Sequence, residues 1–193
     1  MNETTKQHGR RLLTPLLNLL AATRVSATAV TVTALPLSVL AAWFFASGRF
    51  VLGGVMVALV GLCDTLDGEL SRRTGTASPL GAFIDSTVDR LSESLVLVGF
   101  YWYYRASWYG LLAVIALVFS LMVSYVRARA EGVGRECKIG FFERPVRVLV
   151  LLFGAFVLGR TWMPVALGVI ALGSFITAIQ RIIYVLSQKE RSA

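Results

Sequence analysis

The sequence predicts an all-α integral membrane protein, with six transmembrane helices preceded by an N-terminal amphipathic helix that lies in the membrane interface. Of its 193 residues, 56% are hydrophobic and only 16% are charged, a balance outside the range of soluble globular domains. The apolar residues also form long runs, and a hydrocarbon core of roughly 30 Å needs about 20 such residues per helical span. Because the length allows about six spans, residues 1–193 are expected to form one membrane domain.

The apolar runs are separated by very short connections. They occupy residues 27–48, 50–71, 82–104, 107–126, 146–159 and 162–186, within a predicted bundle over residues 25–187. Arg49, Arg105 and Arg160 are the only basic residues in the three turns that pair these runs, whereas the other 16 of the 19 Lys and Arg residues lie at the opposite ends or termini. The positive-inside rule therefore predicts that both termini, and the helix ends that carry most of the basic residues, face the cytoplasm. A prokaryotic inner or cell membrane is the expected location.

Residues 1–24 are predicted to form the interfacial helix. Arg10 and Asn18 lie on one polar helical face, and leucines fill most of the rest, a pattern typical of helices that lie on a membrane. A cleaved signal peptide is the alternative, because a basic start and an apolar stretch precede the small residue Ser26. Pro15 and Asn18 interrupt that stretch and a long apolar span follows at once, which favours the interfacial helix.

The formal net charge is +8. In a membrane protein this charge is expected to reflect basic loops beside anionic lipid, and no nucleic-acid partner is predicted. Cys63 and Cys137 are the only cysteines, too few for a disulfide framework or a thiolate metal site. We expect both to pack as small apolar residues.

Four aspartates interrupt the apolar pattern. Asp64 and Asp67 lie in the second run, and Asp85 and Asp89 lie in the third. A carboxylate inside a bilayer costs about 2.5–3.5 kcal/mol on insertion scales, so four of them require a compensating partner. Spacings of three and four residues place each pair on one helical face, where the two pairs can meet across a single hairpin.

Metal ions are the partner that these carboxylates favour. Oxygen ligands without nearby His or Cys select Mg²⁺, Mn²⁺ or Ca²⁺ over zinc, and paired divalent ions suit phosphoryl transfer. The alternative is a set of structural salt bridges to Arg72, Arg73 and Arg90. Two other classes of function remain: an ion-coupled membrane transporter, since carboxylates often mark ion pathways, and a structural scaffold.

The residues around the aspartates form a longer motif. It reads Asp64-x2-Asp67-Gly68-x2-Ser71-Arg72-x8-Gly81-x3-Asp85-x3-Asp89. This string closely resembles the signature of the CDP-alcohol phosphotransferase family, which usually has alanine in place of Ser71. Physically, Gly68 would let a nucleotide approach the helix backbone and Arg72 could hold a phosphate with two donors; the alternatives are a helix-packing glycine and a snorkelling arginine.

The resemblance implies an enzyme that transfers a phosphatidyl-type group from a CDP-linked lipid to an acceptor hydroxyl and releases CMP. It implies two divalent cations, Mg²⁺ or Mn²⁺, with Asp64, Asp67 and Asp85 as principal ligands. Asp89 would be the general base and a partial ligand. The implied nucleotide contacts are Thr28, Ala29, Val30, Thr31, Gly68, Ser71, Arg72 and Ser78. The chain departs from the family at the start of the first span. The family often has a Pro-Asn or Pro-Asp pair there, whereas this chain has Ala27-Thr28.

Basic residues in the second half narrow the resemblance. The segments 124–131 and 140–147, followed by Gln180-Arg181, look like the phosphatidylinositol phosphate synthase branch, which implies that Arg127, Arg147 and Arg181 bind the phosphate of inositol phosphate. Bacterial members commonly have lysine where this chain has Arg127. Three convergent arginines suit a phosphate-bearing acceptor better than an uncharged alcohol.

Several alternatives stay open within the family. Related enzymes accept glycerol phosphate, as phosphatidylglycerophosphate synthases do, or serine, and the lipid could be CDP-diacylglycerol or an archaeal ether-lipid equivalent. The resemblance also implies a homodimer. Small residues such as Gly53, Gly54, Gly110 and Ala113 could equally pack helices within one chain.

Overall fold

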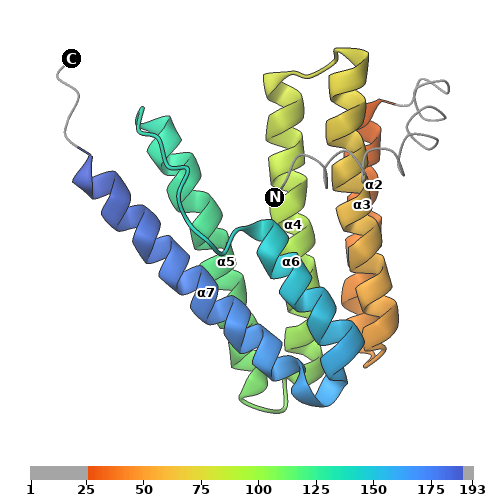
Figure 1. The fold of residues 1–193 in the computed structure, drawn as a ribbon. Helices are drawn as coiled ribbons and strands as arrows, with labels where there is room; N and C mark the ends of the chain where they lie inside the picture. Colours follow the sequence, from red (N-terminus) through yellow and green to blue (C-terminus); the bar gives the residue numbers. More distant parts are fainter. Residues whose placement is uncertain (1–25, 189–193) are drawn as a thin grey trace.

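The computed structural model describes residues 26–188, and these residues confirm the all-helical prediction (Figure 1). The predicted interfacial helix over residues 1–24 lies outside the described residues. The elements are α2 (Ala27–Ala46), α3 (Phe50–Thr74), α4 (Pro79–Tyr104), α5 (Tyr109–Gly132), α6 (Arg144–Phe153), the π-helical segment η1 (Gly154–Leu158) and α7 (Gly159–Ser187).

Local capping explains where α2 and α4 begin and where α3 ends. The hydroxyl oxygens of Ser26 and Ser78 accept hydrogen bonds from the backbone N–H groups three residues later, as N-cap residues do. Gly75 ends α3 with φ 66°, a left-handed conformation that glycine adopts without strain. Helix α4 therefore starts at Pro79, three residues before the apolar run that predicted it.

Four helical stretches among the described residues are long and apolar enough to cross a membrane. They are α2, α3, α5 and the continuous stretch Arg144–Ser187. That last stretch reverses direction between α6 and α7 (Figure 1), at Gly159 with its positive φ of 64°. The chain is thus a multi-pass membrane protein, and large apolar side chains such as Trp43, Leu149 and Leu172 are exposed on its surface, where lipid would cover them.

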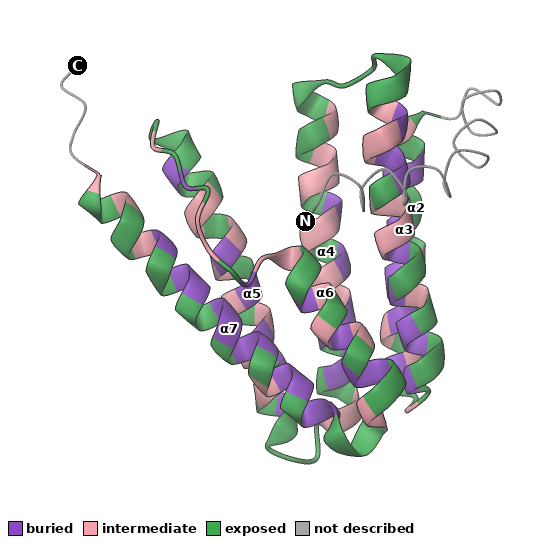
Figure 2. Ribbon diagram, in the orientation of Figure 1, coloured by how far each residue is buried: buried purple, intermediate pink, exposed green. Residues whose placement is uncertain are grey.

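The helices form two groups that share one core. Helix α2 packs on α3 and α4, and α5 packs on α7 and α4, while α6 contacts α3 and α7. The two groups converge at the end that holds the α4–α5 connection and diverge toward the α3–α4 connection (Figure 1). Buried residues line the inner faces of the helices, with exposed ones outside (Figure 2).

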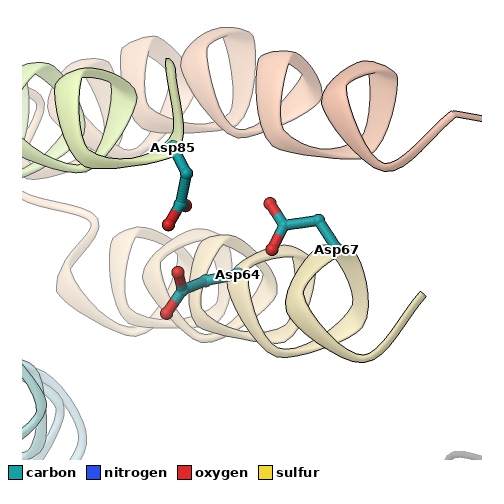
Figure 3. Close-up of side chains that lie close together, drawn as sticks. All are labelled: Asp64, Asp67 and Asp85. Atoms are coloured by element: carbon teal, nitrogen blue, oxygen red, sulfur yellow. The ribbon is translucent and has the colours of Figure 1, made fainter. Parts of the chain in front are cut away.

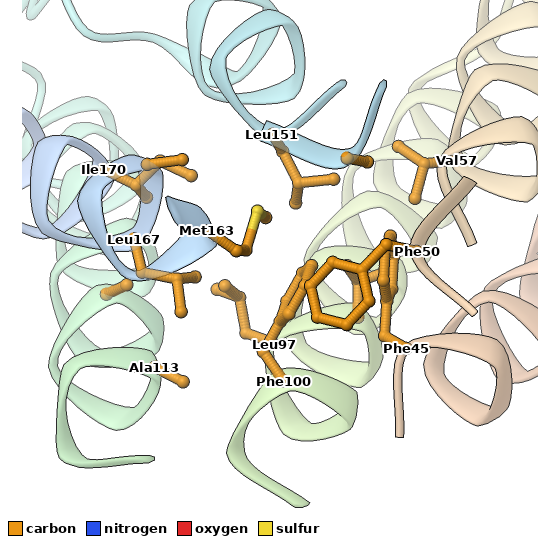
Figure 4. Packing of buried hydrophobic residues seen from close by; sticks show 14 of the residues in the cluster. Phe45, Phe50, Val57, Leu97, Phe100, Ala113, Leu151, Met163, Leu167 and Ile170 are labelled. Atoms are coloured by element: carbon orange, nitrogen blue, oxygen red, sulfur yellow. The ribbon is translucent and has the colours of Figure 1, made fainter. Parts of the chain in front are cut away.

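Aromatic rings fill the convergent end of the core (Figure 4). The ring centroid of Phe45 lies 5.7 Å from that of Phe50, in an edge-to-face arrangement within the range of favourable aromatic pairs. It lies only 4.1 Å from that of Phe100. Gly53 and Gly99 allow this packing, since a Cβ atom at either position would lie under 3.0 Å from α2 atoms. Gly53 and Gly54 both contact other helices of the same chain, so their small size serves packing within it.

Gly99→Ala is predicted to destabilise the fold. An added Cβ would lie 2.5 Å from the Ala42 backbone oxygen, and forcing helices apart typically costs about 1–3 kcal/mol. Thermal unfolding in detergent should show a lower Tm. Gly168→Ala is the matched control, because no atom lies within 4 Å of its built Cβ and alanine is the better helix former; equal Tm values for the two variants would contradict the close α2–α4 contact.

Candidate active site

Three carboxylates meet near the divergent end of the bundle. Asp64 and Asp67 project from α3 and Asp85 projects from α4 (Figure 3), and one carboxylate oxygen from each lies within 4.8 Å of the others. Asp67 is buried, Asp64 and Asp85 are half-buried, and Asp85 Oδ1 is buried without a hydrogen-bond partner among the described residues. Three oxygen donors with an unsatisfied buried atom fit a hard divalent cation.

Thr31 connects α2 to this carboxylate group. Its hydroxyl donates to Asp67 Oδ2 over 2.5 Å and also lies 3.1 Å from the Ala27 carbonyl oxygen of its own helix. A hydrogen bond to a ligand carboxylate fixes the direction of its oxygens. The residue predicted to contact a nucleotide therefore contacts a predicted metal ligand.

The fourth aspartate has a different partner. Asp89 lies one helical turn after Asp85, but its Oδ1 is 2.8 Å from Arg144 Nη2 at the start of α6. The other terminal nitrogen of the same guanidinium, Nη1, lies 3.1 Å from Asp64 Oδ2. Arg144 thus joins Asp89 to the three-carboxylate group. The general-base role of Asp89 stays a prediction.

A cavity of about 510 Å³ opens on one side of the aspartates. Asp67 and Asp85 line it. Five of the eight predicted nucleotide contacts line it as well: Thr28, Thr31, Gly68, Ser71 and Ser78. The space beside Gly68 is open, since a Cβ there would meet nothing closer than 3.6 Å. We call this space the first cavity.

The other three predicted contacts lie elsewhere. Val30 is buried against Leu66 and Leu70, so its side chain packs α2 on α3. Ala29 is exposed and does not line the first cavity. The side chain of Arg72 is 60% exposed and pairs with Glu69 at 3.0 Å. The contact of Arg72 with a nucleotide phosphate stays a prediction.

A second cavity of about 340 Å³ lies on the Asp64 side. Its polar lining includes Arg144, Arg147, Glu93 and the buried Ser92, and its apolar lining comes mainly from α3, α4 and α6. Ser92 Oγ has no hydrogen-bond partner among the described residues. The aspartate cluster thus stands between two cavities, one with hydroxyl and glycine walls and one with arginines.

Comparison with known proteins identifies the family. A family model described as CDP-alcohol phosphatidyltransferase matches residues 24–180. The chain belongs to this family. An archaetidylinositol phosphate synthase from Methanothermobacter thermautotrophicus is 40% identical over 145 residues, which cover 73% of this chain and 73% of the relative.

Solved structures share the fold. Phosphatidylinositol phosphate synthase from Mycobacterium tuberculosis with CDP-DAG bound matches with a TM-score of 0.85 and 31% identity, covering 95% of this chain and 99% of that chain. The same enzyme in complex with manganese and citrate matches with a TM-score of 0.83 and 30% identity, covering 93% and 92%. CDP-alcohol phosphatidyltransferases use divalent cations, which agrees with the carboxylate group found here.

The three predicted acceptor arginines of this CDP-alcohol phosphatidyltransferase differ in environment. Arg147 is 2% exposed and binds both carboxylate oxygens of Glu93, at 2.5 and 2.7 Å. Arg181 is also buried and donates to Glu143 and to two backbone carbonyl oxygens. Arg127 is half-exposed and pairs with Glu131. Of the three arginines, only Arg147 lines the second cavity.

Sequence reasoning missed two site residues. Glu93 continues the spacing of four residues that runs from Asp85 to Asp89, so the spacing indicated that Glu93 lies on the same helical face. Arg144 belongs to the basic segment 140–147, but no role was predicted for it. No sequence spacing indicates that Arg144 contacts Asp64, because 80 residues separate them.

Thr31→Val is predicted to weaken Mn²⁺ binding about tenfold, because loss of an outer hydrogen bond to a metal ligand typically costs about 10–100-fold in affinity. Electron paramagnetic resonance of free Mn²⁺ would measure the affinity. Thr33→Val is the matched control, since the Thr33 hydroxyl bonds to the Val30 carbonyl of its own helix. Equal affinities in both variants would show that Thr31 does not position Asp67.

Proposed function

We propose that this chain transfers a phosphatidyl-type group from a CDP-linked lipid to a hydroxyl of a phosphorylated polyol, inositol 1-phosphate, and releases CMP. The observation that carries the proposal is the aspartate cluster between two cavities of different chemistry. A transferase of this kind must hold a nucleotide-linked donor and a separate acceptor on opposite sides of one phosphorus atom. The archaeal relative and the mycobacterial structures, named for inositol phosphate chemistry, support this acceptor.

The first cavity is the proposed donor site. Ser71, Ser78 and Thr28 offer hydroxyl groups to a cytidine or its phosphates, and Gly68 leaves room beside the helix backbone. CDP-diacylglycerol or an ether-lipid equivalent would place its diphosphate at Asp67 and Asp85, where the cavity meets the carboxylates. The match to a structure with CDP-DAG bound supports a donor of this type.

The proposed cofactors are two divalent cations, Mg²⁺ or Mn²⁺. Asp64, Asp67 and Asp85 would hold one, and Asp89 would contribute to the second. Bound there, divalent cations supply positive charge that stabilises the transferring phosphoryl group and the departing CMP. Asp85 Oδ1, which is buried and has no hydrogen-bond partner within residues 26–188, is the observation that fits a cation.

Asp89 is the proposed general base. It would take the proton from the acceptor hydroxyl as that oxygen forms a bond to the lipid-side phosphorus. The bond from this phosphorus to the CMP oxygen breaks, and CMP leaves with the electron pair. Asp89 is 17% exposed in its side chain, so solvent has limited access to the proton it would accept.

The second cavity is the proposed acceptor site. Arg147 keeps guanidinium N–H groups beyond those that bind Glu93 and the Phe142 carbonyl oxygen, because an arginine carries five. With Arg144 in the same wall, the cavity would attract the phosphate of the acceptor. Arg127 on α5 and Arg181 on α7 are also proposed to bind the acceptor phosphate.

The proposed topology has six crossings, with both termini and the active site in the cytoplasm. Arg49, Arg105 and Arg160 lie in or beside the connections at the convergent end, and the aspartate cluster lies toward the other end. Helices α4 and α6 would cross as separate spans, because the chain alternates direction between them (Figure 1). Residues 1–24 would lie at the interface, and the active form would be a homodimer.

A screen of acceptors for CMP release is predicted to rank inositol 1-phosphate above glycerol 3-phosphate, with inositol and serine giving little product. The paired arginines of the second cavity favour a phosphate dianion over an uncharged alcohol, and the relatives named for inositol phosphate favour inositol over glycerol. Purified protein, one CDP-lipid and Mn²⁺ are sufficient for the measurement. CMP release with serine but with neither phosphorylated acceptor would contradict the proposed acceptor.

Asp89→Asn is predicted to lower the CMP-release rate at least 10²-fold, because general-base catalysis typically contributes about 10²–10⁴-fold. Glu136→Gln is the control, since Glu136 is an exposed loop residue that pairs with Lys138. Near-normal turnover of the Asp89 variant would remove this residue from the base role.

A further inference from the structure

Three residues at the start of α6 form ion pairs with three other helices. Glu143 pairs with Arg181 of α7 at 2.9 Å, Arg147 pairs with Glu93 of α4, and Arg144 contacts both α3 and α4. We call these residues, Glu143, Arg144 and Arg147, the α6 ion-pair cluster. Two of its pairs join an arginine to a glutamate, whereas Arg144 alone binds carboxylates of the proposed metal site.

Arg144 lies where a cation is required. Its two terminal nitrogens contact Asp64 and Asp89 from different helices, and its side chain is only 20% exposed. Two carboxylates that contact one guanidinium would repel each other without a cation between them. In the protein described here, that cation is the Arg144 guanidinium.

Arg144 differs from Arg147 in how fully its guanidinium is hydrogen-bonded. Its Nε is buried without a hydrogen-bond partner among the described residues, whereas both Nε and Nη2 of Arg147 bind Glu93. A guanidinium with a buried, unsatisfied N–H is held less completely than one with its donors paired. Of the two arginines in the cluster, Arg144 is therefore the one that can move at the lower cost.

We propose that Arg144 is an exchangeable counter-ion of the metal site. It holds Asp64 and Asp89 in place while divalent cations are absent and competes with the cation that requires Asp89. The inference rests on the proposed two-cation site and adds an order to it: the three-carboxylate group of Asp64, Asp67 and Asp85 loads first, and Asp89 becomes available only when Arg144 leaves it.

The second cavity gives Arg144 a place to go. Arg144 already lines it together with Arg147, so a guanidinium released from Asp89 stays beside the proposed acceptor phosphate. Cation loading would then raise the positive charge available to the acceptor, which couples the two binding events. Arg144 is a positioning residue in this scheme, since it acts through Asp64 and Asp89.

Mn²⁺ binding by the full-length protein in detergent, without donor or acceptor, tests the role of Arg144. Arg144→Gln should bind the weaker class of Mn²⁺ ions at least tenfold more tightly than wild type, because the competing cation is gone. Arg144→Lys keeps the charge but cannot bridge two carboxylates, and its affinity should lie between them. Arg105→Gln, at the convergent end and in contact with Trp102, is the control and should match wild type.

Thermal unfolding gives a second readout. Without divalent ions, Arg144→Gln should unfold at a lower Tm than wild type because Asp64 and Asp89 lose their counter-ion, and Mn²⁺ should raise its Tm by more, since a ligand that binds more tightly stabilises more. If Arg144→Gln folds only with Mn²⁺, Arg144→Lys, which keeps the charge, carries the comparison of affinities with wild type.

Mn²⁺ affinity in Arg144→Gln equal to or weaker than in wild type would overturn the exchange. Because no substrate is present, this result is independent of the proposed reaction. Absence of CMP release by the wild-type protein, together with tighter Mn²⁺ binding by Arg144→Gln, would reject the reaction and keep the role of Arg144.

Discussion

Repulsion between carboxylates in a poorly polar environment is the constraint on which the site depends. Asp64, Asp67 and Asp85 bring oxygens within 4.8 Å of one another, and burial strengthens the repulsion between like charges. The surrounding helices offset this repulsion with hydrogen-bond donors to the carboxylates: Thr31 from α2 and Arg144 from α6. Four helices are therefore tied to the carboxylates, and any cation that binds there also stabilises their arrangement.

The two ends of the bundle have opposite chemistry. Aromatic rings close the convergent end, where Gly99 lets α4 approach α2 at the distance of backbone contact. The divergent end carries the charges and leaves two cavities beside them. A tightly packed apolar base can hold polar side chains at fixed separations in the open part, as catalysis of group transfer requires.

The sequence predicted the elements and the carboxylate group because both depend on local rules. Spacings of three and four residues place Asp64 and Asp67 on one face, and the short connection after α3 brings Asp85 to them. The rotation of α2 about its axis was not predictable in the same way. Val30 turns into the core while Thr31 turns to Asp67, because packing against α3 and α4 selects which face of an almost uniformly apolar helix points inward.

The carboxylate partners of Arg144 and Arg147 could not be predicted, because these contacts join residues 54 to 80 positions apart. Stability alone does not account for them either, since apolar residues of similar volume often replace a buried ion pair at no loss of stability. Both Arg144 and Arg147 line one cavity beside the carboxylates. A pair of cations held there by carboxylates keeps positive charge in a half-buried site without metal or substrate, and the same carboxylates can exchange that charge when a divalent cation or a phosphate arrives.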